Sequence, residues 1–180
     1  IEKLFREVLN GFLIATYSSN YKIFLGQIYK SVHNPNGESG SQLWHTDSGP
    51  GTCINLMMSL TNLSKNNGAM ECLPWSNSVT LGKQVRNYVR NYINGLPDKG
   101  SNLSRMEYRS ILCDFYEKNI NENYTKDIIQ PTGGKGTILA FRNNCLHKGG
   151  YPQKGSERIV CLFHIYPSIN PLPTEKYRLN

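Results

Sequence analysis

Three polar side chains suggest the chemistry of this sequence. His45 and Asp47 are separated by one residue, and His147 follows one hundred residues after Asp47. On an extended segment the side chains of His45 and Asp47 point to the same side, so both can reach one ion. Two imidazoles and one carboxylate are the ligand set that binds a non-haem Fe(II) and leaves its opposite face open. The sequence therefore predicts a metal centre formed by His45, Asp47 and His147.

Arg158 suggests which molecule such a centre would use. It lies eleven residues after His147, on the next expected strand. A guanidinium stays charged and pairs with a carboxylate through two parallel hydrogen bonds, whereas lysine offers only a point charge. A bidentate 2-oxo acid would fill two open positions on iron and dioxygen the third, with Arg158 binding the far carboxylate of 2-oxoglutarate. Gln27, on an early strand, is a further candidate for a hydrogen bond to this co-substrate.

The elements expected to position these residues are mostly strands. Apolar and charged residues alternate at helical spacing over residues 2–14, and residues 34–41 consist almost entirely of turn formers. Extended segments are expected at residues 21–32, 42–47, 52–63, 69–74, 128–130, 136–141 and 158–166. The turn chemistry of residues 64–68 (SKNNG) predicts that the segments on either side of it form a hairpin.

Helical periodicity replaces strand periodicity around residues 81–126. Ser104, with Glu107 three residues later, is a capping-box signature for the second of two helices there. Antiparallel strands interrupted once suggest a mainly β fold, a double-stranded β-helix (jelly roll) with a helical insertion around residues 81–126. The mouth of such a fold can hold a metal between its sheets, where ligands distant in sequence converge.

Length and cysteine content set broad limits. The 180 residues suit a single domain over residues 1–180, and no apolar run is long enough to span a bilayer. The chain starts at Ile1 rather than Met, so truncation at the N-terminus stays open. The five cysteines are an odd number without a C-x-x-C pair, which favours free thiols in a reducing, cytoplasmic setting.

The net charge of +7 and the pI near 9.2 bear on partners. The basic residues are dispersed rather than clustered, so nucleic acid is not favoured as a partner. Such a field would attract an anionic substrate or co-substrate, although a solvated basic surface explains the charge equally well. The expected partners are a small-molecule substrate, anionic under the first interpretation, and dioxygen, with no membrane.

Several segments occur in a fixed order along most of the chain: 44–47 (WHTD), 63–74 (LSKNNGAMECLP), 134–141 (GKGTILAF), 147–150 (HKGG) and Arg158. In these the chain resembles the phytanoyl-CoA dioxygenase family of Fe(II)/2-oxoglutarate-dependent oxygenases. The resemblance implies His45, Asp47 and His147 as iron ligands and Arg158 as the anchor for 2-oxoglutarate. It also implies a jelly-roll fold, release of succinate and carbon dioxide, and usually hydroxylation of a small molecule.

The sequence departs from that family at three places. The region before the first core strand is short, and residues 81–126, the kind of region from which substrates are usually recognised, align with nothing in the family. Gly149 occupies a position where a hydroxyl residue often helps to hold the co-substrate. The resemblance therefore supports the reaction type and leaves the substrate open.

Two other interpretations stay open. A jelly-roll binding module with a structural or vestigial metal site would keep the fold and show no dependence on 2-oxoglutarate. A hydroxylase acting on a protein or nucleic-acid side chain would share the iron site. A halogenase is disfavoured, because Asp47 occupies the place that a halide would need.

Overall fold

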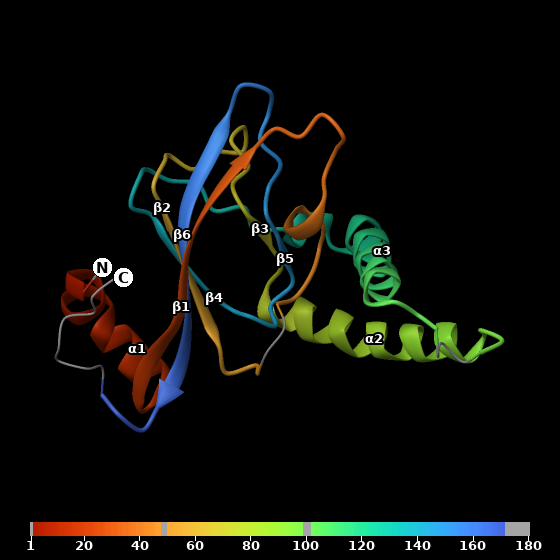
Figure 1. Cartoon of the computed structure of the whole chain (residues 1–180), viewed down its shortest axis with the longest axis horizontal. Coiled ribbons are helices and arrows are strands. Elements are labelled where there is room, and N and C mark those ends of the chain that lie inside the picture. Colours follow the sequence, from red (N-terminus) through yellow and green to blue (C-terminus); the bar gives the residue numbers. More distant parts are fainter. Residues whose placement is uncertain (1, 48–49, 99–101, 172–180) are drawn as a thin grey trace.

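A computed structural model describes residues 2–47, 50–98 and 102–171 (Figure 1). A four-stranded antiparallel sheet, in the order β1-β6-β2-β4, is accompanied by a second sheet of two strands, β3 and β5. The strands are β1 (Asn20–Val32), β2 (Ile54–Ser59), β3 (Glu71–Cys72), β4 (Ile138–Arg142), β5 (His147–Lys148) and β6 (Glu157–Ser168).

Helices flank the strands at two ends of the molecule. A π-helical stretch, η1 (Leu4–Leu9), continues into α1 (Asn10–Tyr17), and both lie against the four-stranded sheet. At the other end, α2 (Trp75–Asn94) and α3 (Arg105–Asn123) pack on each other beside the two-stranded sheet (Figure 1). Two 3-10 turns are η2 (Gly40–Gln42) and η3 (Thr125–Asp127). No helix in the described part of the chain has the length and apolar character needed to cross a bilayer.

Successive side chains of β6 point to opposite faces of the four-stranded sheet, and both faces receive apolar residues from it. Phe163 and Ile165 point toward η1 and α1, where Phe163 meets the ring of Phe5 edge-on at a centroid distance of 5.1 Å. Val160 alternates with them, so it points to the opposite face and packs with Met57. Burying a side chain of this size stabilises the fold by about 1.5–3 kcal/mol. Both faces of the sheet are therefore held by apolar packing.

Several sequence predictions are confirmed. The helix over residues 2–14 and the strands over residues 21–32 and 158–166 correspond to η1 with α1, to β1 and to β6. The capping box is present, since Glu107 N donates to Ser104 Oγ over 3.2 Å and Ser104 N donates to Glu107 Oε2 over 2.8 Å. The protein is rich in antiparallel sheet and carries a helical insertion, whereas the complete jelly roll stays a prediction.

The predicted hairpin between residues 52–63 and 69–74 is wrong. The turn itself forms, because Ala69 N donates to Ser64 O over 3.0 Å. However, β2 is already paired with β6 on one side and with β4 on the other. Neither edge of β2 can accept another strand, so the chain crosses to the second sheet, where β3 pairs with β5.

Two predicted boundaries also need correction. The helical insertion begins at Trp75 rather than near residue 81, directly after Pro74, whose ψ of 149° is extended. The expected strand over residues 42–47 is reduced to one bridge, between His45 and His147. The 3-10 turn η2 lies just before it, because Ser39 and Gln42 form a local capping box that competes with strand pairing.

The two ends of the helical insertion lie beside Cys72, the last residue of β3. Residues 128–130, expected as a strand, make a single bridge in which Cys72 N donates to Ile129 O and Ile129 N donates to Cys72 O, both over 2.9 Å. The chain therefore leaves β3 just after Cys72 and returns to the same residue after α2, α3 and η3.

Two glycine-containing segments cross at close range. A Cβ placed on Gly68 would lie 2.5 Å from Gly150 O, and a Cβ placed on Gly150 would overlap Ala69 O. Gly68 also has a φ of +81°, a conformation that favours glycine. Two of the segments that carry the family resemblance, residues 63–74 and 147–150, therefore contact each other through their backbones.

We predict that Gly150→Ala lowers the free energy of unfolding by about 1–3 kcal/mol, because the added methyl forces the crossing segments apart. The control is Gly82→Ala, since Gly82 lies inside α2 and a Cβ there would meet no neighbouring atom. Alanine favours a helix over glycine by about 1 kcal/mol, so this variant should be stabilised. Urea denaturation followed by circular dichroism measures both, and a neutral Gly150→Ala would contradict the crossing.

Candidate metal centre

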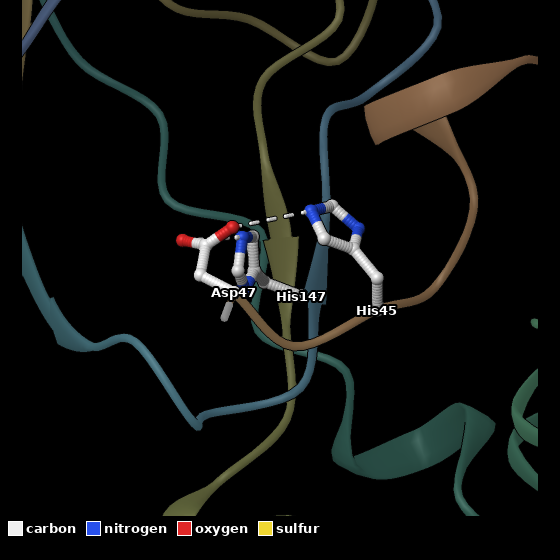
Figure 2. Close-up of side chains that lie close together, drawn as sticks. All are labelled: His45, Asp47 and His147. Atoms are coloured by element: carbon white, nitrogen blue, oxygen red, sulfur yellow. Dashed lines mark ion pairs between the residues drawn. The ribbon is translucent and has the colours of Figure 1, made fainter. Parts of the chain in front are cut away.

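Three of the predicted residues converge on one point. Ligand atoms of His45, Asp47 and His147 all lie within 4.8 Å of one another, and the three side chains point toward one another (Figure 2). Asp47 uses both oxygens, with Oδ1 3.6 Å from His45 Nε2 and Oδ2 3.6 Å from His147 Nε2. No other group of three His, Cys, Asp or Glu side chains in the described ranges converges in this way.

Backbone pairing brings the two histidines together. His45 N donates to His147 O and His147 N donates to His45 O, both over 3.0 Å. Asp47 N donates to Asn143 O over 2.7 Å, which anchors the carboxylate residue to the turn after β4. All three candidate ligands are thus positioned by main-chain hydrogen bonds.

A backbone carbonyl orients each imidazole. His45 Nδ1 lies 2.7 Å from Leu43 O, and His147 Nδ1 lies 2.9 Å from Cys145 O. Because a carbonyl can only accept, each Nδ1 carries the proton and each Nε2 keeps its lone pair. This tautomer turns the nitrogen that can bind a metal toward the shared centre.

The surroundings favour the charged form of the Asp47 carboxylate and the neutral form of the His147 imidazole. Asn55, fully buried on β2, donates from Nδ2 to Asp47 Oδ2 over 2.5 Å. Burial alone would raise the pKa of Asp47, but His45, His147 and the Asn55 bond lower it overall. Burial, together with the nearby charge of His45, lowers the pKa of His147. These are the protonation states in which such groups bind a metal.

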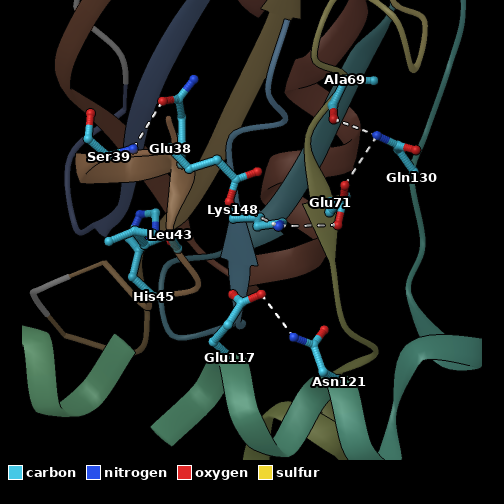
Figure 3. A network of polar contacts seen from close by, with 11 residues as sticks. Glu38, Ser39, Leu43, His45, Ala69, Glu71, Glu117, Asn121, Gln130 and Lys148 are labelled. Atoms are coloured by element: carbon cyan, nitrogen blue, oxygen red, sulfur yellow. Dashed lines mark hydrogen bonds and ion pairs between the residues drawn. The ribbon is translucent and has the colours of Figure 1, made fainter. Parts of the chain in front are cut away.

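Lys148, the residue after His147, fixes the loop that leads to His45. Its Nζ lies 3.4 Å from Glu38 Oε2 in that loop and 4.0 Å from Glu71 Oε2 on β3, and its side chain is mostly buried (Figure 3). Burial raises the pKa of Glu71, an effect that the charge of Lys148 opposes. Lys148 therefore connects β5 with β3 and with the segment that carries the first candidate ligand.

Arg158 reaches the interior from β6 with only 6% of its surface exposed. Nη1 donates to Gly68 O over 2.5 Å and Nη2 donates to Ser31 Oγ over 3.2 Å, whereas Nε has no partner. Burial lowers the pKa of Arg158 to about 10, so the group stays charged at neutral pH. No carboxylate among the described residues forms an ion pair with it. A buried charge without a counter-charge is costly, which makes this guanidinium a candidate anion site.

Strand register places the guanidinium and the metal centre on the same face of the larger sheet. Ser31 lies opposite Arg158, and Asn55 lies opposite His164. Arg158 and His164 are separated by an even number of residues on β6, so they share a face. Because Asn55 contacts Asp47, this is the face on which the metal centre lies.

Gln27 lies on this face of β1, four residues before Ser31. The hydroxyl of Tyr29 donates a hydrogen bond to the side-chain oxygen of Gln27. Burial and the charge of Asp47 raise the pKa of Tyr29, so the phenol lies within electrostatic reach of the metal centre. The proposed contact of Gln27 with a co-substrate stays a prediction.

Asn55, Ser31 and Tyr29 lie at the site although no motif in the sequence indicated them. Asn55 did carry a signal, because it is a single amide inside the apolar run of β2, where a buried polar group needs a partner. Ser31 and Tyr29 carry no such signal. Residues of both types are common on a partly exposed strand, so only the register of β1 with β6 reveals their position.

No protein-family model and no curated protein matches this chain. Solved structures do match it. EvdMO1 is 16% identical with a TM-score of 0.55, over 95% of this chain and 32% of its own. SnoN, described as a non-haem α-ketoglutarate-dependent epimerase from nogalamycin biosynthesis, is 12% identical with a TM-score of 0.51, over 88% and 52%. HygX from Streptomyces hygroscopicus, solved with iron bound, is 10% identical with a TM-score of 0.52, over 91% and 65%.

At 10–16% identity this likeness establishes a shared fold. The chain spans between 32% and 65% of the length of these three proteins. The fold is therefore one that also occurs in a non-haem enzyme and in an iron-bound protein, as their descriptions state.

We predict that the stability of the metal-free protein falls as the pH drops from about 7.5 to 5.5. The pKa of His147 in the folded protein is lowered from 6.5, so the unfolded chain binds more protons. The stabilisation is complete above the unfolded pKa and decreases below it. Urea denaturation across this range measures the effect, and His147→Gln should show a shallower pH dependence. An unchanged slope in that variant would assign the effect to another group.

Proposed function

We propose that this chain is a non-haem Fe(II)- and 2-oxoglutarate-dependent dioxygenase of the phytanoyl-CoA dioxygenase kind, on a jelly-roll framework. It hydroxylates a small molecule and releases succinate and carbon dioxide. One observation carries the proposal: the His45–Asp47–His147 cluster and the buried guanidinium of Arg158 lie on one face of the same sheet. A bound dicarboxylate that also binds the metal would use both.

The donor set fits ferrous iron. Two neutral imidazole nitrogens and one carboxylate leave coordination positions free on one side of the ion. Asp47 offsets part of the metal charge, and Asn55 fixes its orientation. When bound, iron and 2-oxoglutarate together supply the oxidation, in which one atom of dioxygen enters the substrate, the other enters succinate, and carbon dioxide leaves.

The remaining residues bind and orient. Arg158 anchors the far carboxylate of 2-oxoglutarate, and Gln27 adds a hydrogen bond to this co-substrate. The ring of Phe141 packs beside the buried imidazole of His147, with the ring centroids 4.8 Å apart and the ring planes tilted by 56°. Excluding water strengthens every electrostatic contact inside the site.

We propose an anionic small molecule as the substrate. The helix α2 carries Lys83, Arg86 and Arg90, all exposed, and contains no acidic residue. Because the described relative SnoN is an epimerase, the product must be identified as well as detected. A gain of one oxygen atom in the mass of the product would indicate hydroxylation, whereas an unchanged mass with altered configuration would indicate epimerisation.

A reducing, cytoplasmic setting completes the proposal. All five cysteines are free thiols, and four of them are buried. Burial raises the pKa of Cys72, the partly exposed one, to about 11, so little of it is thiolate at neutral pH. Protonated, buried thiols suit a compartment in which disulfides do not form.

An anaerobic titration with Fe(II) and 2-oxoglutarate tests this function through the visible metal-to-ligand charge-transfer band. We expect the band in the wild-type protein and its loss in His147→Ala. In Arg158→Ala the affinity for 2-oxoglutarate should fall by about a hundredfold or more, because two charge-assisted hydrogen bonds are lost. Fe(II) binding should be retained in that variant.

The matched control is Arg105→Ala, since Arg105 is exposed on α3. It should leave both affinities unchanged. Undiminished 2-oxoglutarate binding by folded Arg158→Ala would refute the anchor. A folded wild-type protein that binds iron and shows no band would favour the binding module with a structural metal site.

A further inference from the structure

Asn55 carries a buried carboxamide whose orientation follows from its two partners. Its Nδ2 lies 2.5 Å from Asp47 Oδ2, and its Oδ1 lies 3.6 Å from the sulfur of Cys53. A carboxylate only accepts hydrogen bonds, so the amide NH2 must be the group that faces Asp47. The amide oxygen then faces Cys53, whose thiol is the donor. Asn55 has no exposed surface, so bulk water does not reach this oxygen.

The reversed orientation of this carboxamide would disturb the metal centre. It would place Oδ1 of Asn55 against the carboxylate of Asp47, and neither group could donate. The affected oxygen, Asp47 Oδ2, is the one that lies 3.6 Å from His147 Nε2. Repulsion there would turn the carboxylate away from His147. A donor to Oδ1 therefore fixes the orientation that holds Asp47, and among the described residues that donor is Cys53.

Main-chain hydrogen bonds complete a closed ring through the same residues. Asp47 N donates to Asn143 O over 2.7 Å, and Asn143 N donates to Cys53 O over 3.1 Å. The thiol of Cys53 continues the ring to Asn55, and the Asn55 amide returns it to Asp47. The three residues other than Asp47 are almost completely buried. One ring therefore holds both the main chain and the side chain of Asp47, and the thiol is its weakest donor.

The thiol of Cys53 is a protonated donor and lies outside the ligand set. Burial raises the pKa of Cys53, although a hydrogen bond with Tyr166 lowers it in part. The ligand atoms that converge are those of His45, Asp47 and His147, without the sulfur of Cys53. The thiol can therefore act on the metal centre only through the groups that it contacts.

We propose that Cys53 is a positioning residue of the metal centre, whose thiol holds the carboxamide of Asn55 in the orientation that donates to Asp47. This rests on the proposed function, because it requires that Asp47 binds a metal ion together with the two histidines. Loss of the thiol weakens metal binding and alters the geometry of the bound ion, although no ligand atom is removed.

The experiment is a titration of the metal-free protein with Co(II), followed through the visible d–d absorption of the bound ion. We expect Cys53→Ala to weaken Co(II) binding by about threefold to tenfold, the value of one neutral hydrogen bond. The shape of the d–d spectrum should change as well, because the carboxylate of Asp47 turns. Cys53→Ser should bind Co(II) more tightly than Cys53→Ala, since a hydroxyl also donates. Equal affinities of these two variants would overturn the proposal.

The matched control is Cys161→Ala, which removes a buried thiol from the apolar cluster on the opposite face of the sheet. It loses similar packing and should leave the affinity and the spectrum of bound Co(II) unchanged. A loss equal to that in Cys53→Ala would assign the effect to packing and refute the proposal. If Cys53→Ala does not fold, Cys53→Thr and Cys53→Val make the same comparison, because they share a shape and differ in the hydroxyl. The threonine variant should then bind Co(II) more tightly.

A double variant tests whether Cys53 acts through Asn55. Asn55→Ala alone should weaken Co(II) binding by about tenfold to a hundredfold, and Cys53→Ala should then add no further loss. A loss that persists in the Asn55→Ala background would refute the proposal. A near-ultraviolet sulfur-to-cobalt charge-transfer band that disappears in Cys53→Ala would also refute it, because Cys53 would then be a ligand. Failure of the proposed function looks different, because the folded wild-type protein would bind Co(II) no more tightly than His147→Ala.

Discussion

Two reciprocal hydrogen bonds between His45 and His147 are the constraint on which the candidate site depends. They join segments about a hundred residues apart in sequence, so they close a long loop whose entropic cost the rest of the fold must offset. Each histidine then uses the carbonyl two residues before it, of Leu43 or of Cys145, to orient its ring. The two imidazoles are thus set by the same local geometry on two different segments, and Asp47 needs only to reach between them.

The crossing of the glycine segments extends this constraint to the anion site. Gly68 packs against Gly150, and its carbonyl is also the acceptor for Nη1 of Arg158. The close approach of the Gly68 and Gly150 backbones therefore fixes the position of the carbonyl that accepts from the guanidinium of Arg158. Lys148, on β5, forms an ion pair with Glu38 in the loop before His45. The segment 147–150 therefore contacts both the loop that leads to His45 and the backbone that positions Arg158. The candidate metal centre and the buried guanidinium of Arg158 are therefore parts of one packed unit.

Much of this arrangement could be predicted from sequence, since the signals were local or chemically specific. A His-x-Asp spacing, a distant histidine and a late arginine pointed to the cluster, and Ser104 with Glu107 marked a helix start correctly. The hairpin after β2 could not be judged locally, because it fails only when β4 and β6 occupy both edges of that strand. Asn55 and Ser31 required the register, which depends on pairings between residues far apart in the chain.

The double bridge between Cys72 and Ile129 has a consequence for how such a protein can change. The helical insertion leaves and re-enters the framework beside this bridge, and it also packs against the framework elsewhere. Leu146 N donates to Ser78 Oγ on α2 over 3.0 Å, and Trp44 and Leu146 share an apolar cluster with α2 and α3. Changes in α2 and α3 that alter this packing therefore act on the residues next to His45 and His147. The helical insertion and the segments that bear the candidate metal ligands must therefore change together if the positions of those ligands are to be kept.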